Sequence, residues 1–485
     1  MSKKVLFNFI WRFLERSGAQ LVQFLVSIVL ARVLMPKQYG IVALLTAFIT
    51  ILSIFIDSGL SSALIQKKDA DDKDFSTVFY VNMALCAVLY ILLFITAPFI
   101  AGLYNNPNMT LYLRVIGITL LIAGVKNVQT AYVSRNLIFK RFFFATLGGT
   151  VGAGILGIIM AYTGFGVWAL IAQSLFNNAV DTLILWLTVK WRPKKFFSFS
   201  RLKGLFSYGW KLLVSSLIDT VYNNIRTLII GGKYSSKELA FYDRGNQFPN
   251  VIVNNINLSI DSVLLPTMSK VQTDKEAVRS MTRRSIKIST FLIAPLLMGL
   301  AFTATPVIRL ILTEKWLPAV FFLRIFCVTY MFYPIHTANL NAIKAVGRSD
   351  MFLKLEIIKK AVGITALLAT LWISVEAMAY SLLFTTVASM IINSWPNRKL
   401  LNYSCFEQMK DIIPGILLAV IMGAIILPIQ YIGLPDIVTL CIQIPLGAII
   451  YILGAKLFKL DSFDYLWGII KGLFKGKEQK EEIKD

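Results

Sequence analysis

Polar side chains recur at helical spacing inside segments that are otherwise apolar. A helix places residues three or four positions apart on one face, so each set forms a stripe along its helix. Cations on these stripes suit the binding of an anion, because a guanidinium presents a fork of donors that matches phosphate oxygens. The stripes comprise Arg12, Arg16, Gln20, Gln23 and Ser27 in residues 8–34; Thr46, Thr50, Ser53, Asp57 and Ser61 in 41–65; Lys211, Ser215, Asp219, Tyr222 and Arg226 in 206–231; and Asp243, Gln247, Asn250, Asn254, Asn257 and Asp261 in 238–266.

The length of these stripes predicts a water-filled, net cationic cavity between two halves of the protein. A charge facing lipid costs about 2.5–3.5 kcal/mol at the bilayer centre, so the stripes face water or one another. Interhelical hydrogen bonding, at about 0.6 kcal/mol per bond, is the alternative and would need only a few polar residues per interface. The predicted substrate contacts are Arg16, Gln20, Gln23, Lys126, Lys211, Tyr222, Arg226, Arg244, Gln247, Asn250, Asn254 and Asn257, and the acids Asp57, Asp219 and Asp261 either pair with these cations or accept a coupling proton or sodium ion.

The elements that carry the stripes occur twice. Ile56-Asp57-Ser58-Gly59-Leu60 returns as Ile260-Asp261-Ser262-Val263-Leu264, and Trp11-Arg12 returns as Trp210-Lys211. Internal duplication with charges at matching depths is typical of transporters, which bind cargo between related halves and rock them to change access. We therefore expect a transporter rather than a membrane enzyme or a scaffold.

The bulk composition places these elements in a membrane. The chain has 485 residues, 56% of them hydrophobic, and a mean hydropathy of +0.68. Apolar runs of about 20 residues, the length that crosses a bilayer as a helix, recur from end to end. Two of them, 238–266 and 319–343, are polar enough for a hydropathy scan to miss. The fourteen predicted spans cover residues 8–34, 41–65, 76–103, 110–134, 142–162, 166–189, 206–231, 238–266, 288–312, 319–343, 355–373, 377–396, 412–432 and 436–458.

The net charge of +23 does not indicate nucleic acid, because the positive residues alternate with the predicted spans. Loops after odd-numbered spans carry only Lys37, Lys233, Lys237 and Lys315, whereas the loops after even-numbered spans are rich in Lys and Arg. Positive loops remain in the cytoplasm. Both termini are therefore predicted to be cytoplasmic.

We predict an all-α polytopic membrane protein of about fourteen transmembrane helices, in two six-helix lobes plus two extra helices. Both copies of the duplication start on the cytoplasmic side, so the repeat is parallel. The tail has apolar residues at helical spacing with Asp461 and Asp464 before Lys471, which is typical of a helix lying on the inner leaflet. The expected domains are 1–189 (N-lobe), 190–205 (basic cytoplasmic linker), 206–400 (C-lobe), 401–460 (two extra spans) and 461–485 (amphipathic helix and charged tail).

No pattern in the sequence indicates an enzyme, a cofactor or a metal. The GxGxxG run at 152–157 lies inside a predicted span, so with Gly148 and Gly149 it indicates close helix packing instead of a dinucleotide site. His336 is the single histidine; we expect a hydrogen-bonded core residue, with contact to cargo as the alternative. The four cysteines are scattered without metal spacing and are expected to be packing residues.

Several motifs resemble bacterial polysaccharide flippases of the Wzx type, WzxC branch, within the multidrug/oligosaccharidyl-lipid/polysaccharide exporter superfamily. The resemblance covers essentially the whole chain. Its motifs are the run 20–40 with Arg32, Pro36, Tyr39 and Gly40; the run 55–67 with Asp57, Gly59 and Gln66; Gly164-Phe165-Gly166-Val167-Trp168; Leu228-Ile229-Ile230-Gly231; Tyr242-Asp243-Arg244-Gly245-Asn246-Gln247; and Glu314-Lys315-Trp316-Leu317-Pro318.

The resemblance implies flipping of a lipid-linked oligosaccharide, typically on undecaprenyl diphosphate, across the bacterial inner membrane for synthesis of a surface polysaccharide. Polysaccharide polymerase and glycosyltransferases are then candidate partners besides membrane lipid. Sugar contacts in this family vary too much to be carried over by position. An exporter of small amphiphilic molecules on the same fold is the alternative, although a cationic cavity disfavours cationic drugs.

Overall fold

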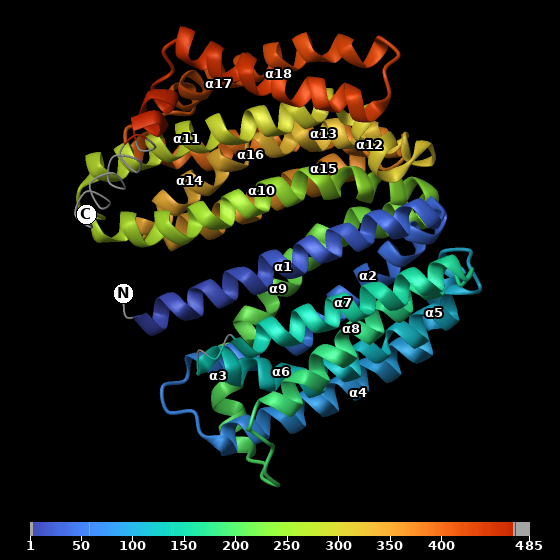
Figure 1. Ribbon diagram of the computed structural model, residues 1–485. Helices are drawn as coiled ribbons and strands as arrows, with labels where there is room; N and C mark the ends of the chain where they lie inside the picture. Colours follow the sequence, from blue (N-terminus) through green and yellow to red (C-terminus); the bar gives the residue numbers. More distant parts are fainter. Residues whose placement is uncertain (1–2, 58, 137, 139, 469–470, 472–485) are drawn as a thin grey trace, which may run out of the picture. The chain divides into compact units, whose positions relative to one another are not determined.

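The computed structural model describes residues 3–57, 59–136, 138, 140–468 and 471. Side chains at 3–17, 57, 140–141, 208 and 258–259 lie outside this description. The described residues contain α-helices and short 3-10 turns but no strand (Figure 1). The helices are α1 (Lys3–Val33), α2 (Pro36–Asp57), α3 (Leu60–Gln66), α4 (Asp72–Leu103), α5 (Met109–Ile116), α6 (Ile118–Arg135), α7 (Lys140–Tyr162), α8 (Val167–Thr188), α9 (Phe199–Lys233), α10 (Ser236–Lys270), α11 (Lys275–Phe302), α12 (Ala304–Leu312), α13 (Ala319–Met331), α14 (Tyr333–Ala345), α15 (Ser349–Thr370), α16 (Val375–Leu400), α17 (Cys405–Ile426) and α18 (Asp436–Leu457), with 3-10 turns at Glu314–Trp316 and Leu427–Tyr431.

The protein is a multi-pass membrane protein. Helices lie within each of the fourteen predicted segments, and ten helical segments of the described chain are long and apolar enough to cross a bilayer. α1, α9, α10 and α15 are not among these ten. As expected, the segment 238–266 in α10 falls below the hydropathy threshold, whereas the segment 319–343 passes it. Fourteen crossings therefore stay a prediction.

Four predicted spans are interrupted in the structure. One cause is proline, which lacks an amide donor: Pro334 stands at the start of α14. At another break the chain packs closely on α4: a Cβ on Gly117 would come within 2.9 Å of the Leu93 side chain. The breaks fall after Asp57 in the predicted span 41–65, at Gly117 in 110–134, at Thr303 in 288–312 and at Phe332 in 319–343.

The chain forms two compact units, Met1–Ala240 and Phe241–Asp485. The first unit includes α9, which packs along α2 and α3. The duplication instead groups α9 with the second half. Packing and duplication are different criteria, so the predicted lobe boundaries stay a prediction.

Glycines hold the helices of the first unit close together. A Cβ on Gly209 of α9 would lie 2.7 Å from the carbonyl of Gly59, so these two backbones meet without side chains between them. A Cβ on Gly40 would lie 1.6 Å from the carbonyl oxygen of Ser236. The predicted small-residue face of α7 is confirmed: a Cβ on Gly149 or Gly154 would come within 2.8 Å of Asn177 or 2.5 Å of Val26. Only glycine permits such approaches.

Candidate functional site: a polar cavity in the first unit

A cavity of about 580 Å³ lies among α2, α3, α6, α7 and α8 of the first unit. Hydroxyl, amide and charged groups make up much of its wall, although the segments that supply them are otherwise apolar. Its polar lining residues are Thr46, Ser53, Ser61, Ser62, Thr119, Lys126, Asn127, Thr130, Thr146, Ser174, Asn178 and Asp181.

The two charged residues that line the cavity form an ion pair between two helices. The Nζ atom of Lys126 on α6 lies 3.0 Å from Oδ2 of Asp181 on α8. The same ammonium donates to Oδ1 of Asn178, one turn earlier on α8, at 3.4 Å. The Lys126 and Asp181 side chains keep 23% and 17% of their surface exposed, so both remain accessible from the cavity.

Hydrogen bonds to α2 and α8 position α6 and therefore Lys126. Asn127 donates its side-chain amide to the carbonyl of Ile56 near the end of α2, at 2.6 Å. Trp186 of α8 donates its indole N–H to the carbonyl of Val125 at 3.1 Å. These bonds fix the residues on both sides of Lys126, so its ammonium is presented to the cavity from a rigid backbone.

Two oxygens at the cavity wall are buried and have no hydrogen-bond partner in the part of the chain that the structure describes. They are Oγ of Ser61 and Oδ1 of Asp181. A buried polar atom left unpaired costs about 1–3 kcal/mol, so such atoms are suited to meeting a ligand. The cavity therefore offers an ammonium, a carboxylate oxygen and a hydroxyl in one place.

The predicted stripe of residues 41–65 contributes to this cavity. Thr46, Ser53 and Ser61 line it, while the Asp57 side chain lies outside the described residues. The stripe thus faces helices of its own unit, which the sequence did not predict. Lys126, predicted to contact an anion, also lines the cavity.

The predicted site residues of α1 and α9 do not line this cavity. Lys211 and Asp219 are exposed, and Tyr222 and Arg226 are half-buried. The remaining members lie on α1: Gln20 is half-buried, Gln23 is exposed, and the side chain of Arg16 lies outside the described residues.

On α10, most of the predicted site residues bond within the second unit. Arg244 is buried; it donates to Gln247, and its guanidinium lies 5.6 Å from the ring centre of Trp316. Asn254 donates to Asn250 at 2.6 Å. The remaining members are Asp261, which accepts from Asn341 at 2.6 Å, and Asn257, which is buried.

A buried polar cluster also joins α14, α16 and α17 of the second unit. The amide of Asn339 donates to Gln408 at 2.7 Å and accepts from Asn397 at 2.6 Å, and Ser394 donates to Gln408 at 3.0 Å. Nearby, His336 shares a hydrogen bond with Asn393, as expected for a core histidine. This cluster matches the interhelical bonding that was the alternative explanation for buried polar groups.

The sequence interpretation missed the α8 side of the cavity. Ser174, Asn178 and Asp181 recur at spacings of four and three residues, which places them on one helix face. α8 is also the least hydrophobic of the ten candidate spans. The spacing of these residues and the low hydropathy of α8 could together have identified this side of the cavity from the sequence.

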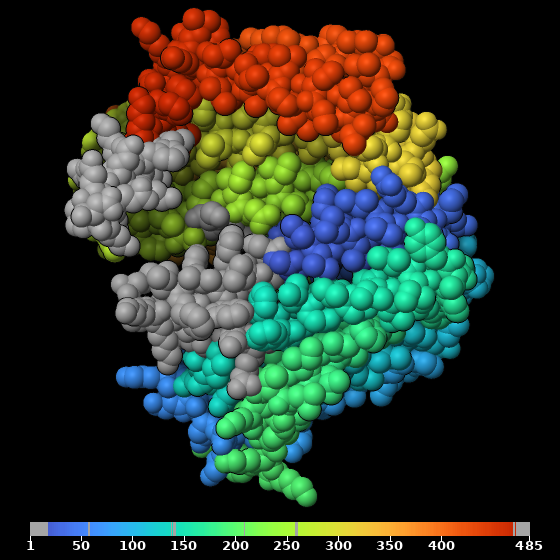
Figure 2. Space-filling view, viewed as in Figure 1, coloured from blue at the N-terminus to red at the C-terminus, as the bar shows by residue number. Residues whose placement is uncertain are grey.

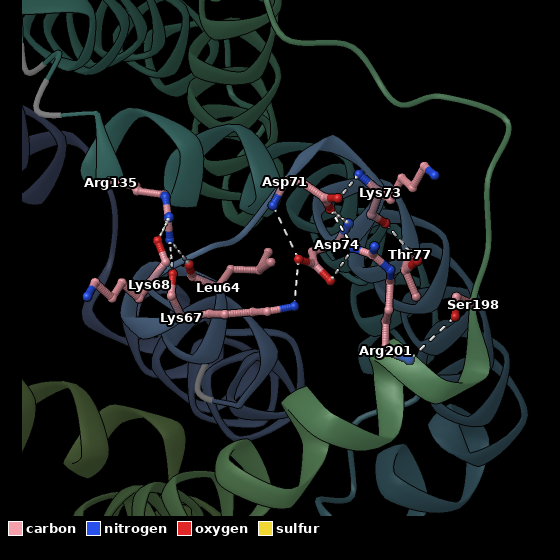
Figure 3. Close-up of polar contacts among 10 residues, drawn as sticks. All are labelled: Leu64, Lys67, Lys68, Asp71, Lys73, Asp74, Thr77, Arg135, Ser198 and Arg201. Carbon is pink, nitrogen blue, oxygen red and sulfur yellow. Dashed lines mark hydrogen bonds and ion pairs between the residues drawn. The ribbon is translucent and has the colours of Figure 1, made fainter.

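A second group of charges lies where α3, α4 and α9 meet, at the end of the unit predicted to be cytoplasmic (Figure 3). Asp74 is fully buried and pairs with Lys67 at 2.7 Å and with Arg201 at 3.1 Å. Arg201 also reaches Asp71 at 2.6 Å. Lys194, in the predicted linker, pairs with Asp72 at 2.7 Å. We call Lys67, Asp71, Asp72, Asp74, Lys194 and Arg201 the linker cluster.

The linker cluster shifts the acidity of Asp71. Burial raises the pKa of this carboxyl, but amide hydrogen bonds from Asp74 and Lys73 and the charge of Arg201 outweigh that effect. The pKa of Asp71 therefore lies below its ordinary value. Beside it, Arg135 donates to the carbonyls of Leu64, Lys67 and Lys68 and so closes the turn after α3.

The chain is similar to known proteins both in sequence and in fold. Residues 29–321 match the family described as Polysaccharide biosynthesis protein. The chain is 24% identical over 407 residues to the teichuronic acid biosynthesis protein TuaB of Bacillus subtilis, covering 82% of this chain and 84% of TuaB. It is 22% identical over 341 residues to the lipopolysaccharide biosynthesis protein WzxC of Escherichia coli, covering 70% and 69%. Its fold is similar to that of the lipid II flippase MurJ in an inward closed conformation, with a TM-score of 0.75, 16% identity and coverage of 93% and 99%.

Proposed function

This chain belongs to the polysaccharide biosynthesis protein family, and on that premise we propose that it flips a polyprenyl-diphosphate-linked oligosaccharide across the bacterial inner membrane. The product would feed synthesis of a surface polysaccharide such as an O-antigen, a capsule or an exopolysaccharide. The observation that carries the proposal is Lys126 inside the polar cavity.

The cavity wall suits a sugar-phosphate head group. Hydroxyls and amides of Ser53, Thr130 and Asn178 match the donors and acceptors of a sugar. The Lys126 ammonium supplies the positive charge that a phosphate needs. The polyprenyl chain would stay in the lipid, because only the head group has to leave it.

Asp181 would compete with the phosphate of the cargo for Lys126. A phosphate that binds Lys126 displaces the Asp181 carboxylate, which then needs a proton or a sodium ion to remain in the cavity. Release of cargo restores the pair. We propose that this exchange accompanies alternating access of the two lobes, with Asp57, Asp219 and Asp261 as further candidates for ion coupling.

The test uses a deletion strain complemented with wild type, with Lys126→Ala or with Lys354→Ala. We expect the deletion to accumulate lipid-linked oligosaccharide on the cytoplasmic leaflet, identified by mass spectrometry. Wild type and Lys354→Ala, which changes an exposed lysine of α15, should clear it. Lys126→Ala should not. If the deletion strain clears the lipid-linked oligosaccharide but loses resistance to small amphiphiles, the protein would instead be an exporter of such molecules.

A further inference from the structure

A pocket of about 390 Å³ lies in the second unit between α11, α17 and the segment that follows α18. The three segments meet near the start of α11, the start of α17 and the end of α18, which the charge pattern places on the cytoplasmic side. Figure 2 shows α17 and α18, in orange and red, against the yellow-green α11. A second pocket of about 410 Å³ shares Arg283, Lys287, Asp461 and Ser462 with the first.

Ion pairs fix part of the pocket wall. Arg283 of α11 binds Asp411 of α17 through two hydrogen bonds of 2.7 Å. Lys287 pairs with Asp461, and Arg279 lies 3.6 Å from Glu407. These pairs account for the three acids that line the pocket.

Three other polar groups at the pocket wall take no part in these ion pairs. Lys410 and Lys459 line the pocket and form no ion pair with a described residue. The hydroxyl of Thr290 is buried and has no hydrogen-bond partner among the described residues. An uncompensated pair of ammonium groups with a buried hydroxyl is a site for an oxyanion.

The surroundings indicate that this oxyanion belongs to a lipid. Tyr465 lines the adjoining pocket and is 41% exposed, and Phe458 and Trp467, close to the lining residues along the chain, are 64% and 48% exposed. Tyrosine and tryptophan gather at the level of lipid head groups. Arg284 lies 4.9 Å from the ring centre of Tyr465 and also lines the adjoining pocket.

We propose that this pocket binds the phosphate of an anionic phospholipid from the inner leaflet, with Lys410, Lys459 and Thr290 as its contacts. Basic pockets between membrane helices on the cytoplasmic side bind such head groups. A surface salt-bridge network alone would explain Arg283 and Lys287 but not the two lysines or the buried hydroxyl. The ion pairs then act as a rigid frame that holds α11 and α17 together at the pocket.

The test compares purified full-length protein carrying Lys410→Gln and Lys459→Gln with a matched control carrying Lys270→Gln and Lys354→Gln. All four lysines are exposed, and the control pair does not line the pocket, so both variants should fold. Binding of phosphatidylglycerol is measured by native mass spectrometry and by the shift in melting temperature. Phosphatidylcholine and inorganic phosphate are the comparison ligands.

We expect the pocket variant to bind phosphatidylglycerol about thirtyfold more weakly than wild type, since each interfacial lysine contributes about 1 kcal/mol. The control variant should bind as wild type does, and phosphatidylcholine should not distinguish the proteins. An equal loss of phosphatidylglycerol binding in both double variants would show that this pocket is not the binding site. Inorganic phosphate that binds as tightly as phosphatidylglycerol would overturn the assignment to a lipid.

Discussion

Lys126 of α6 and Asp181 of α8 face each other across 3.0 Å inside the cavity of the first unit. Both charges lie within segments apolar enough to cross the membrane. The pair balances charge within the cavity. Under the proposed function an anionic cargo would compete with Asp181 for Lys126, so the pair is the point at which to test transport.

Lys126→Ala should reduce flipping by about tenfold or more, because a hydrogen bond to a charged group contributes roughly 1.5–3 kcal/mol. Lys126→Arg should keep part of the activity, since the charge remains but its geometry changes. The measurement is the ratio of outer- to inner-leaflet oligosaccharide in cells with matched protein levels. Wild-type transport by a well-expressed Lys126→Ala protein would remove Lys126 from the mechanism.

Gly209→Ala should destabilise the first unit by about 1–3 kcal/mol, the usual cost of overpacking. The new Cβ would lie 2.7 Å from the carbonyl of Gly59, and backbone atoms cannot move aside as a side chain can. The matched control is Gly204→Ala in the same helix, where a Cβ meets nothing within 4 Å. The melting temperature in detergent should drop for Gly209→Ala alone. Similar melting curves for both variants would contradict the close contact.

Arg201→Gln should loosen the predicted linker. Arg201 joins α9 to Asp71 and Asp74, and Lys194 ties the linker to α4 through Asp72 and through Ser76, whose hydroxyl accepts from the Lys194 amide at 2.9 Å. We expect trypsin to cleave at 190–195 several-fold faster in inside-out vesicles. Arg348→Gln, which breaks the separate pair with Asp350, should leave this rate unchanged. An unaltered rate in Arg201→Gln would show that the cluster does not hold the linker.

The low pKa of Asp71 predicts acid sensitivity of the same region. A carboxyl whose pKa is lower in the folded state stabilises the protein above its unfolded pKa, and this contribution is lost as the pH falls through the folded value. Protection of the linker from an acid-tolerant protease such as pepsin should therefore decline below about pH 4. Asp71→Asn should weaken that decline, and an identical pH profile for both proteins would assign the effect to other acids.

Cysteine labelling should decide whether α15 crosses the membrane. In a background without the four native cysteines, a cysteine at Trp372 should react with an impermeant reagent in intact cells. A cysteine at Arg348, at the other end of α15, should react only after permeabilisation. Labelling of both positions from one side would mean that α15 does not cross, which would contradict the fourteen-span topology.

The positions of the helices could be predicted because apolar runs have the length of a bilayer. The α2 stripe and Lys126 could be recognised from helical spacing and charge. Asp181 was missed because periodicity shows which face of a helix is polar but not which neighbour it meets. For the same reason, the sequence did not show that Arg244 and Gln247 bond to each other.

The breaks within the predicted spans could not be predicted from composition either. Gly117, at one of the breaks, lies close against α4, and such packing is a tertiary property. The glycine contact between Gly59 and Gly209 joins residues from the two halves of the duplication. Sequence repetition therefore did not predict that α9 packs within the first unit.

The junction between the compact units has a practical consequence for dissecting the protein. The first unit ends at Ala240 and the second begins at Phe241, yet both residues lie inside the continuous helix α10. Cutting there would strand amides and carbonyls that the helix pairs. Separately expressed halves should instead be divided at Tyr234–Ser235, between α9 and α10. The second fragment would then keep α10 intact, while the first would lose only the short stretch that packs against Gly40.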